Sequence, residues 1–223
     1  MHVVVNAAQS VDGKLSTRRR TQLRISGPED FDRVDRIRAA ADAVLVGIGT
    51  VLADDPSLTV KEEPRRVSRL QNGRPGNPAR VVVDSRARTP TDAAVLDEAA
   101  ETFLLVSETA TPDRRDALEA TGATVIVAGE ERVDLEAGFT ELSEHGVDRL
   151  MIEGGGEVIH SCFAAGLVDE LDVYVGSLVI GGRDAPTLAD GDGFIEAFPR
   201  LELVGVERLD DGVVLSYTVG GTR

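Results

Sequence analysis

Three consecutive glycines between an apolar run and an amphipathic run form the pattern with the clearest chemical meaning. The stretch reads Ile152-Glu153-Gly154-Gly155-Gly156-Glu157-Val158-Ile159. A glycine backbone approaches a ligand closely, and the first turn of a following helix presents unpaired N–H groups to an anion. The stretch is therefore a candidate site for a phosphate or a dinucleotide pyrophosphate. A plain turn between strand and helix is the alternative, and the spacing is not the G-x-G-x-x-G of a Rossmann fold.

A second glycine-containing stretch lies at residues 46–59, where an apolar run ends in Gly47 and Gly49 and leads into a short helical turn. Thr50 and Asp54 are four residues apart, so they share one face of that turn. A hydroxyl and a carboxylate on one face are suited to the ribose hydroxyls or amide groups of a cofactor. The alternative is that the Asp54-Asp55 pair only caps the turn before the chain reaches a proline.

Other reactive residue types carry weaker signals. The Ser10-Val11-Asp12-Gly13-Lys14 segment reads as turn chemistry when taken alone. The three histidines (His2, His145 and His160) lack metal-ligand spacing, so we predict no metal site. Cys162 is the only cysteine, which excludes an intramolecular disulfide and fits a reducing compartment.

The elements that position these residues follow the pattern of an α/β protein with a largely parallel sheet, since short apolar runs alternate with amphipathic stretches. The predicted strands cover residues 3–8, 43–46, 81–83, 103–106, 124–127, 149–152 and 170–175. Four helices are predicted. The first covers 28–41, where Phe31, Val34 and Ile37 recur at helical spacing, and the second covers 113–120. The third ends near His145-Gly146, and the fourth runs from 156 to about 165.

The C-terminal part changes character. Residues 201–208 and 213–219 are apolar runs on either side of Asp210-Asp211-Gly212, a turn sequence that tolerates positive φ, so they predict an antiparallel hairpin. Residues 62–79 are polar and show no apolar periodicity, and we interpret them as a long loop on the surface rather than a lid.

Length and charge limit the class of protein. The 223 residues, 42% of them hydrophobic, fit a single domain over residues 1–223. No apolar run approaches the length of a membrane span, and the first residues do not resemble a signal peptide, so we expect a cytoplasmic protein without a membrane partner. The formal net charge of −15, from 39 acidic and 24 basic residues, disfavours a nucleic-acid partner.

The type of basic residue points to the habitat. Only Lys14 and Lys61 are lysines; the other basic residues are arginines. A surface rich in carboxylates and poor in lysine stems suits molar salt, which screens the self-repulsion of the acidic groups. We therefore predict a halophile that keeps molar salt in its cytoplasm as the source; the alternative is a GC-rich genome, which also favours arginine over lysine.

Taken together, the motifs resemble the reductases of riboflavin biosynthesis, whose fold is similar to that of dihydrofolate reductase. The resemblance covers nearly the whole chain and rests on S-V-D-G-K at 10–14, residues 38–59, V-V-V-D-S at 81–85, E-G-G-G at 153–156 and A-G-L-V-D-E-L at 165–171. No deaminase signature is present. The chain therefore resembles the stand-alone reductases of archaea and fungi, and the C-terminal reductase domain of the bacterial bifunctional deaminase-reductases.

The resemblance implies an NADPH-dependent enzyme that reduces the ribosyl group of 2,5-diamino-6-ribosylamino-4(3H)-pyrimidinone 5′-phosphate to ribityl, with NADH as a possible substitute. It implies cofactor contacts at Ala8, Thr50, Asp54, Ser85, Gly155, Gly156, Glu157 and Val158. It implies substrate contacts at Arg38, Leu58 and Glu153, with Arg24 and Lys61 in addition. Glu153 is also the candidate for assisting proton transfer, and a pure binding role is the alternative.

Related reductases pair near their last strands, and residues 176–180 are apolar, so a homodimer is expected. Three other functions remain open at this point. The substrate could be the deaminated amino-uracil compound or a pterin or folate, or the chain could bind nucleotides without catalysing a reaction.

Overall fold

The computed structural model describes residues 1–20 and 23–220, and they form two compact units. The first unit contains Met1 and Asp35–Met151. The second unit contains the described residues of His2–Val34 and Ile152–Arg223. Strand β6 (Arg149–Gly154) and helix α1 (Pro28–Ala40) each contribute residues to both ranges.

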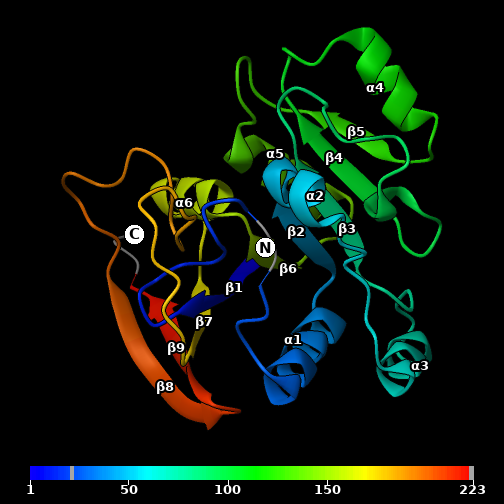
Figure 1. The fold of residues 1–223 in the computed structure, drawn as a ribbon. Coiled ribbons are helices and arrows are strands. Elements are labelled where there is room, and N and C mark those ends of the chain that lie inside the picture. The colour runs from blue at the N-terminus through cyan, green and yellow to red at the C-terminus, as the bar shows by residue number, and fades with distance from the viewer. Residues whose placement is uncertain (21–22, 221–223) are drawn as a thin grey trace. The chain divides into compact units, whose positions relative to one another are not determined.

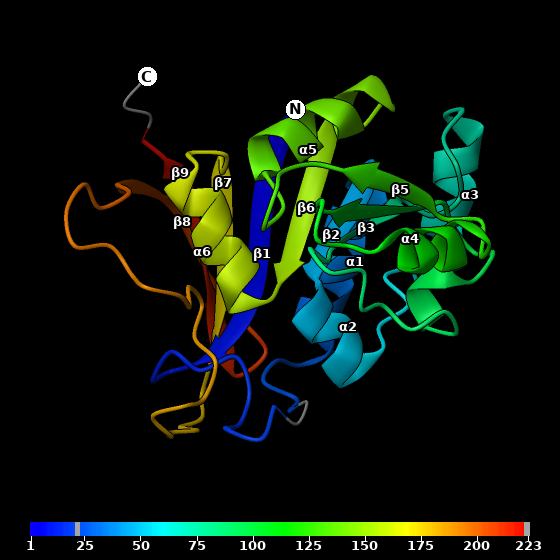
Figure 2. The same cartoon turned by 90° about the horizontal axis from the view of Figure 1, so that it is seen from above.

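The first unit is built on four parallel strands in the order β5-β4-β3-β2 (Figures 1 and 2). They are β2 (Ala43–Gly47), β3 (Ala79–Val83), β4 (Thr102–Val106) and β5 (Thr124–Val127). Every residue of β2 and β4 is buried, as expected for parallel strands that are covered on both faces. The strands predicted at 43–46, 81–83, 103–106 and 124–127 are thus confirmed.

The helices of this unit are α2 (Ile48–Asp54), α3 (Glu63–Gln71), α4 (Pro112–Glu119) and α5 (Leu135–Glu144), with a 3₁₀ turn at Ala94–Leu96. Gly122 and Gly146 follow α4 and α5 with positive φ, the conformation typical of glycines that end helices.

The prediction of a long loop at residues 62–79 is wrong, because helix α3 forms there. Its docking groups are arginines at helical spacing. Arg65 pairs with Asp35, and Arg69 donates to the carbonyl oxygens of Ala39 and Ala41 at the end of α1. Burial lowers the pKa of Arg69 to about 10. A search for apolar periodicity misses such a helix, since guanidinium groups make the buried contacts.

The second unit combines parallel and antiparallel pairing. Strand β1 (His2–Ser10) runs parallel to β7 (Glu170–Gly176), and β7 pairs antiparallel with β9 (Gly212–Val219), which pairs with β8 (Leu201–Leu209). The β8–β9 hairpin is orange and red in Figure 1. Helix α6 (Gly156–Ala164) follows β6. The predicted fold class, a mixed and mostly parallel sheet with helices and a C-terminal antiparallel hairpin, is confirmed.

Helix α1 forms within one residue of its predicted bounds, but its buried side is charged. Phe31 is 52% exposed, whereas Asp30 and Arg33 are buried. The Arg33 guanidinium donates to Asp30 at 2.9 Å and to the Asn6 side chain at 2.7 Å. A buried arginine is tolerated when its donors are satisfied in this way, so polar contacts dock this part of the helix.

The hairpin turn stabilises the start of α1. The Asp210 carboxylate accepts hydrogen bonds from the backbone N–H groups of Glu29 and Asp30 at 3.2 and 3.0 Å. These N–H groups belong to the first turn, where a helix has no internal acceptors. A Cβ atom at Gly27 would lie 2.3 Å from Asp210 Cγ, so glycine is required for this close approach.

Within residues 1–20 and 23–220, no helix is both long enough and apolar enough to span a bilayer.

Candidate functional site

The three glycines at the junction of β6 and α6 differ in whether the structure requires a glycine. Gly154 has a φ of 148°, which residues with a side chain rarely adopt. A Cβ atom at Gly156 would lie 2.3 Å from the Thr187 carbonyl oxygen and 2.8 Å from Asp190 Oδ2, so Gly156 is needed for close packing. Gly155 has ordinary extended angles, φ −82° and ψ 175°. The Gly154–Gly155 peptide bond is cis.

The N-terminus of α6 has the features expected of an anion site on its Gly155 side. Gly155 is the N-cap residue, and no side chain caps the helix there. The positive end of the helix dipole and the first-turn N–H groups attract an anion at such a position. The Asp190 carboxylate lies on the Gly156 side, where its Oδ1 accepts from the N–H and hydroxyl groups of Thr187.

The second unit holds the remaining residues of this group. Glu153 is half-buried and directly precedes the glycines at the end of β6. Glu157 is exposed and Val158 is half-buried in the first turn of α6. Ala8 is half-buried on β1, in register with Tyr174 of β7. Arg24 is exposed, and its guanidinium lies 5.3 Å from the centre of the Phe31 ring.

In the first unit, Thr50 and Asp54 lie on α2 as predicted, and the neighbouring Asp55 makes the turn. Asp55 adopts a left-handed conformation as the C-cap residue, and its carboxylate accepts from the Ala94 N–H at 2.7 Å. Asp54 lies at the surface, and partial desolvation of its carboxyl raises its pKa. The capping role therefore belongs to Asp55, which leaves Thr50 and Asp54 as the candidate ligand pair.

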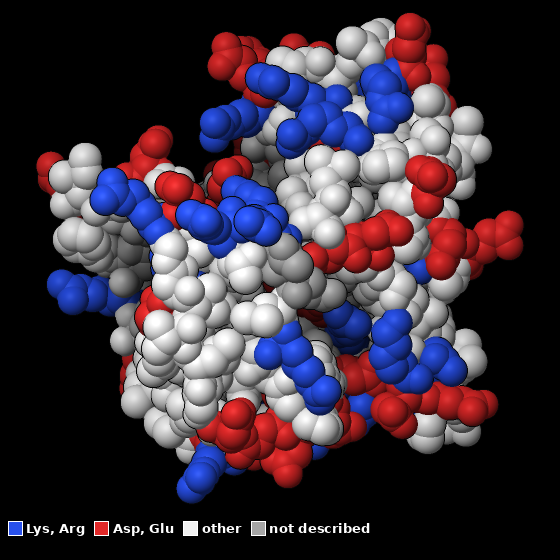
Figure 3. Space-filling model, in the orientation of Figure 1, with Lys and Arg blue, Asp and Glu red and all other residues white. Residues whose placement is uncertain are grey.

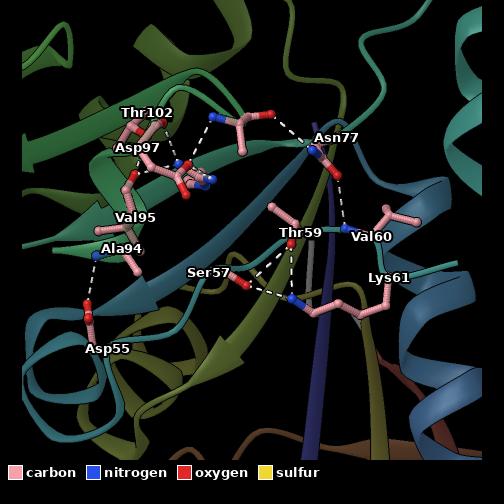
Figure 4. Close-up of polar contacts among 12 residues, drawn as sticks. Asp55, Ser57, Thr59, Val60, Lys61, Asn77, Ala94, Val95, Asp97 and Thr102 are labelled. Atoms are coloured by element: carbon pink, nitrogen blue, oxygen red, sulfur yellow. Dashed lines mark hydrogen bonds and ion pairs between the residues drawn. The ribbon is translucent and has the colours of Figure 1, made fainter. Parts of the chain in front are cut away.

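Leu58 and Lys61 lie on the segment that follows α2. Leu58 is buried and has a φ of 51°. The Lys61 Nζ atom donates to Ser57 Oγ at 2.7 Å and to Thr59 Oγ1 at 3.1 Å (Figure 4). The sequence reasoning missed Ser57 and Thr59. Polar side chains at every second position, Ser57, Thr59 and Lys61, were the available signal.

Arg38 and Ser85 also lie in the first unit. The Arg38 guanidinium donates to the carbonyl oxygen of Thr59 at 3.2 Å, which brings α1 and the Leu58–Lys61 segment together. Ser85 follows β3, and its hydroxyl oxygen accepts from the Val133 N–H at 3.1 Å. The predicted residues thus form two sets, each within one unit: Arg38, Thr50, Asp54, Leu58, Lys61 and Ser85; and Ala8, Arg24, Glu153 and Gly155–Val158.

Among the residues that the structure describes, no group of three or more His, Cys, Asp or Glu side chains is arranged to hold a metal ion. Cys162 is buried on α6, and burial raises the pKa of its thiol to about 12. A thiol in such an environment stays protonated and unreactive.

Comparison with known sequences gives two archaeal relatives of similar length. A protein of Archaeoglobus fulgidus is 47% identical over 215 residues, covering 96% of both chains. A protein of Methanothermobacter thermautotrophicus is 46% identical over 223 residues, covering 99% of both chains. Each is named 2,5-diamino-6-ribosylamino-4(3H)-pyrimidinone 5′-phosphate reductase.

Solved structures confirm the fold. A pyrimidine reductase-like protein of Corynebacterium diphtheriae has a TM-score of 0.86 at 21% identity, covering 99% of this chain and 92% of the other. Dihydrofolate reductase of Enterococcus faecalis has a TM-score of 0.50 at 14% identity, covering 99% and 97%. The family model for the RibD C-terminal domain matches residues 1–215. With that match and its archaeal relatives, the chain belongs to the RibD C-terminal domain family.

Proposed function

We propose that this protein is the NADPH-dependent reductase that converts the ribosylamino group of 2,5-diamino-6-ribosylamino-4(3H)-pyrimidinone 5′-phosphate into the ribitylamino group. The observation that carries this proposal is the 47% identity, over 96% of both chains, with an archaeal protein of that name. The family model includes both units, so we propose that they constitute one reductase domain. The test is NADPH oxidation by the purified protein with this pyrimidine and with its deaminated counterpart.

A nicotinamide cofactor fits the residues present. The N-terminus of α6 lacks a side-chain cap at Gly155, which suits a phosphate group of the cofactor. We propose that Gly155, Gly156, Glu157 and Val158 hold the cofactor, together with Ala8, Thr50, Asp54 and Ser85. The bound cofactor supplies the hydride, and the protein supplies orientation and electrostatics.

The substrate requires groups for its ribose and its phosphate. We propose that Glu153 binds the ribose and moves a proton at the sugar as the ring opens. Cations are needed for the phosphate, and Arg38 with Lys61 or Arg24 provides them. The Lys61 ammonium is already held by two hydroxyls, so little side-chain freedom is lost when it binds an anion.

We propose that the protein is adapted to high salt, and we expect its thermal midpoint to rise with KCl. Figure 3 shows acidic side chains in several groups over the displayed face, with basic ones among them. Fifteen excess negative charges repel one another, and screening shortens that repulsion from about 30 Å at 0.01 M to about 3 Å at 1 M salt. The salt that stabilises the fold also screens the arginines that bind phosphorylated ligands, and so weakens ligand binding. We expect the gain in stability to outweigh this loss of affinity, because the repulsion acts over the whole surface.

The measurement is thermal unfolding at 0.1 M and 2 M KCl. A midpoint that stays constant or falls at 2 M would show that the excess of acidic residues is not an adaptation to salt.

We propose a homodimer that pairs through its last strands. Strand β8 lies at the end of the order β1-β7-β9-β8, and an edge strand has backbone groups available for pairing. Val204 and Val206 on this strand are 59% and 62% exposed, and Val179 is 73% exposed. We expect light scattering in 2 M KCl to give the mass of two chains. A single-chain mass at micromolar concentration would contradict the pairing.

A further inference from the structure

The segment from Ser57 to Lys61 is fixed mainly through its backbone. Arg38 of α1 donates to the Thr59 carbonyl oxygen at 3.2 Å. Asn77 Oδ1 accepts from the Val60 N–H at 3.1 Å (Figure 4). Leu58 occupies a left-handed conformation, with φ 51°, while its side chain is buried. Residues with a side chain adopt this conformation only when their surroundings enforce it. The contacts around Leu58 therefore determine where Lys61 is placed.

Asp35 of α1 accepts three further hydrogen bonds, at the end of this segment and around the start of α3. Its Oδ1 accepts from the Lys61 N–H at 2.6 Å, and its Oδ2 accepts from the Glu62 N–H at 3.2 Å and from Arg65 at 2.8 Å. The Asp35 side chain is only 6% exposed. Burial by itself raises the pKa of Asp35, but the hydrogen bonds from Lys61, Arg65 and Glu62 outweigh it, so the pKa falls below its ordinary value.

Helix α3 closes the arrangement from the other side. Arg66 donates to the carbonyl oxygens of Val60 and Lys61 at 2.9 and 3.2 Å. The neighbouring Arg65 is the ionic partner of Asp35. The backbone at Lys61 thus has its N–H held by α1 and its carbonyl held by α3. Removing the Asp35 charge weakens the hydrogen bonds that its carboxylate accepts from the Lys61 N–H and from Arg65 at the same time.

The placement of the backbone determines the placement of the charge. Lys61 Nζ reaches Ser57 Oγ and Thr59 Oγ1, which lie 3.3 Å apart. An ammonium group held by two hydroxyls has a defined position only if the backbone that carries all three side chains is itself fixed. A displacement of about 1 Å in a substrate-positioning group costs up to about 100-fold in efficiency.

We propose that Asp35 is a positioning residue that sets the Leu58–Lys61 segment for the pyrimidine substrate, acting through the backbone of Lys61 and through Arg65. Asp35 itself does not touch the substrate. The inference rests on the proposed function, in which Leu58 and Lys61 contact that substrate.

Asp42 provides a matched control within the same unit. Its Oδ1 accepts from Arg74 at 2.7 Å, and its Oδ2 accepts from the N–H groups of Asp148 and Arg149 at 3.1 and 2.8 Å. Like Asp35, Asp42 thus accepts from one arginine and from two consecutive backbone N–H groups, but these N–H groups lie at the start of β6. Asp42→Asn therefore imposes a comparable structural defect without acting on Lys61.

The first test requires no substrate, because the chain has only two lysines. Wild type, Asp35→Asn and Asp42→Asn are acylated briefly in 2 M KCl with an amine-reactive ester, and labelling at Lys61 is compared with Lys14 by mass spectrometry. Acylation requires an amino group that can approach the ester freely, so the two hydrogen bonds of Lys61 Nζ slow its labelling. We expect the Lys61-to-Lys14 labelling ratio to rise at least about threefold in Asp35→Asn, as expected when charge-assisted hydrogen bonds are lost, and to stay constant in Asp42→Asn. An unchanged ratio, or an equal rise in both variants, overturns the proposal.

The second test separates binding from turnover. The kinetics are measured at a temperature well below the unfolding midpoint of every variant. We expect Asp35→Asn to raise KM for the diaminopyrimidine phosphate about tenfold and to leave KM for NADPH within about twofold of wild type. Asp42→Asn should leave both values unchanged. A rise in both KM values, or in neither, contradicts the role of Asp35.

If Asp35→Asn does not fold, Arg65→Gln replaces it. We expect the Lys61-to-Lys14 labelling ratio and the KM for the pyrimidine to rise in this variant too. An unchanged labelling ratio in Arg65→Gln also counts against the proposal. If wild type turns over neither pyrimidine, the proposed function fails, while the labelling ratio still decides whether Asp35 positions Lys61.

Discussion

Replacing Gly155 with aspartate is expected to abolish cofactor binding while leaving the fold intact. Gly155 is the N-cap residue of α6 and has φ −82° and ψ 175°, which any residue adopts. Aspartate is among the preferred N-cap residues, so the helix itself tolerates the change. The new carboxylate would stand at the positive end of the helix, where we propose that a cofactor phosphate binds. The variant thus opposes binding without opposing folding.

The expected loss is large. Two like charges about 4 Å apart repel by about 4 kcal/mol at the effective dielectric of a protein surface, and about 1.4 kcal/mol corresponds to a tenfold change in Kd. We therefore expect the Kd for NADPH, measured by fluorescence titration, to rise at least about 100-fold. Gly155→Ser is the matched control, since serine also caps helices but carries no charge, and it should stay within about tenfold of wild type. Unchanged NADPH affinity in folded Gly155→Asp would remove the glycine stretch from the cofactor site.

Glu153→Gln is expected to have the second large effect, a loss of turnover with little change in NADPH binding. Glu153 is half-buried at the end of β6, next to the glycines. Glutamine keeps the size of the side chain and removes its capacity to carry a proton. General acid–base groups contribute about 10²- to 10⁴-fold, so we expect kcat to fall at least about 100-fold.

Steady-state kinetics with both substrates provide the check, and Glu119→Gln on the exposed surface of α4 is the control. A rise in the pyrimidine KM with kcat unchanged would limit Glu153 to binding the ribose. Wild-type values for both parameters would exclude it from the site.

The strands were predictable from the sequence because their burial is simple. Residues 43–46 and 103–106 are continuous apolar runs, and both form strands whose residues are all buried. The hairpin followed from Asp210-Asp211-Gly212, and Asp210 does adopt a positive φ of 51°. The contact of Asp210 with the start of α1 could not be predicted, because it joins residues 181 and 180 positions apart.

Elements docked by charged groups were less predictable. Helix α3 buries Arg69, and α1 buries Asp30, Arg33 and Asp35 while Phe31 stays exposed. Hydrophobic periodicity carries no information about such contacts. The motif at 153–156 was correctly predicted to join a strand to a helix. The sequence could not show which glycine was needed for backbone conformation and which for close packing. That distinction depends on Thr187 and Asp190, more than 30 residues further along the chain.

Oxidation of NADPH with the two competing pyrimidines tests the proposed function most directly. The purified protein is assayed in 2 M KCl with the 2,5-diamino compound and with the deaminated amino-uracil compound, each with NADPH and with NADH. Sites that hydrogen-bond a distinguishing polar group discriminate strongly against the analogue that lacks it, so we predict kcat/KM at least about tenfold higher for the diamino compound with NADPH. A higher kcat/KM for the amino-uracil compound would place the reduction after deamination, and no oxidation with either compound by the folded protein would contradict the assignment as a reductase.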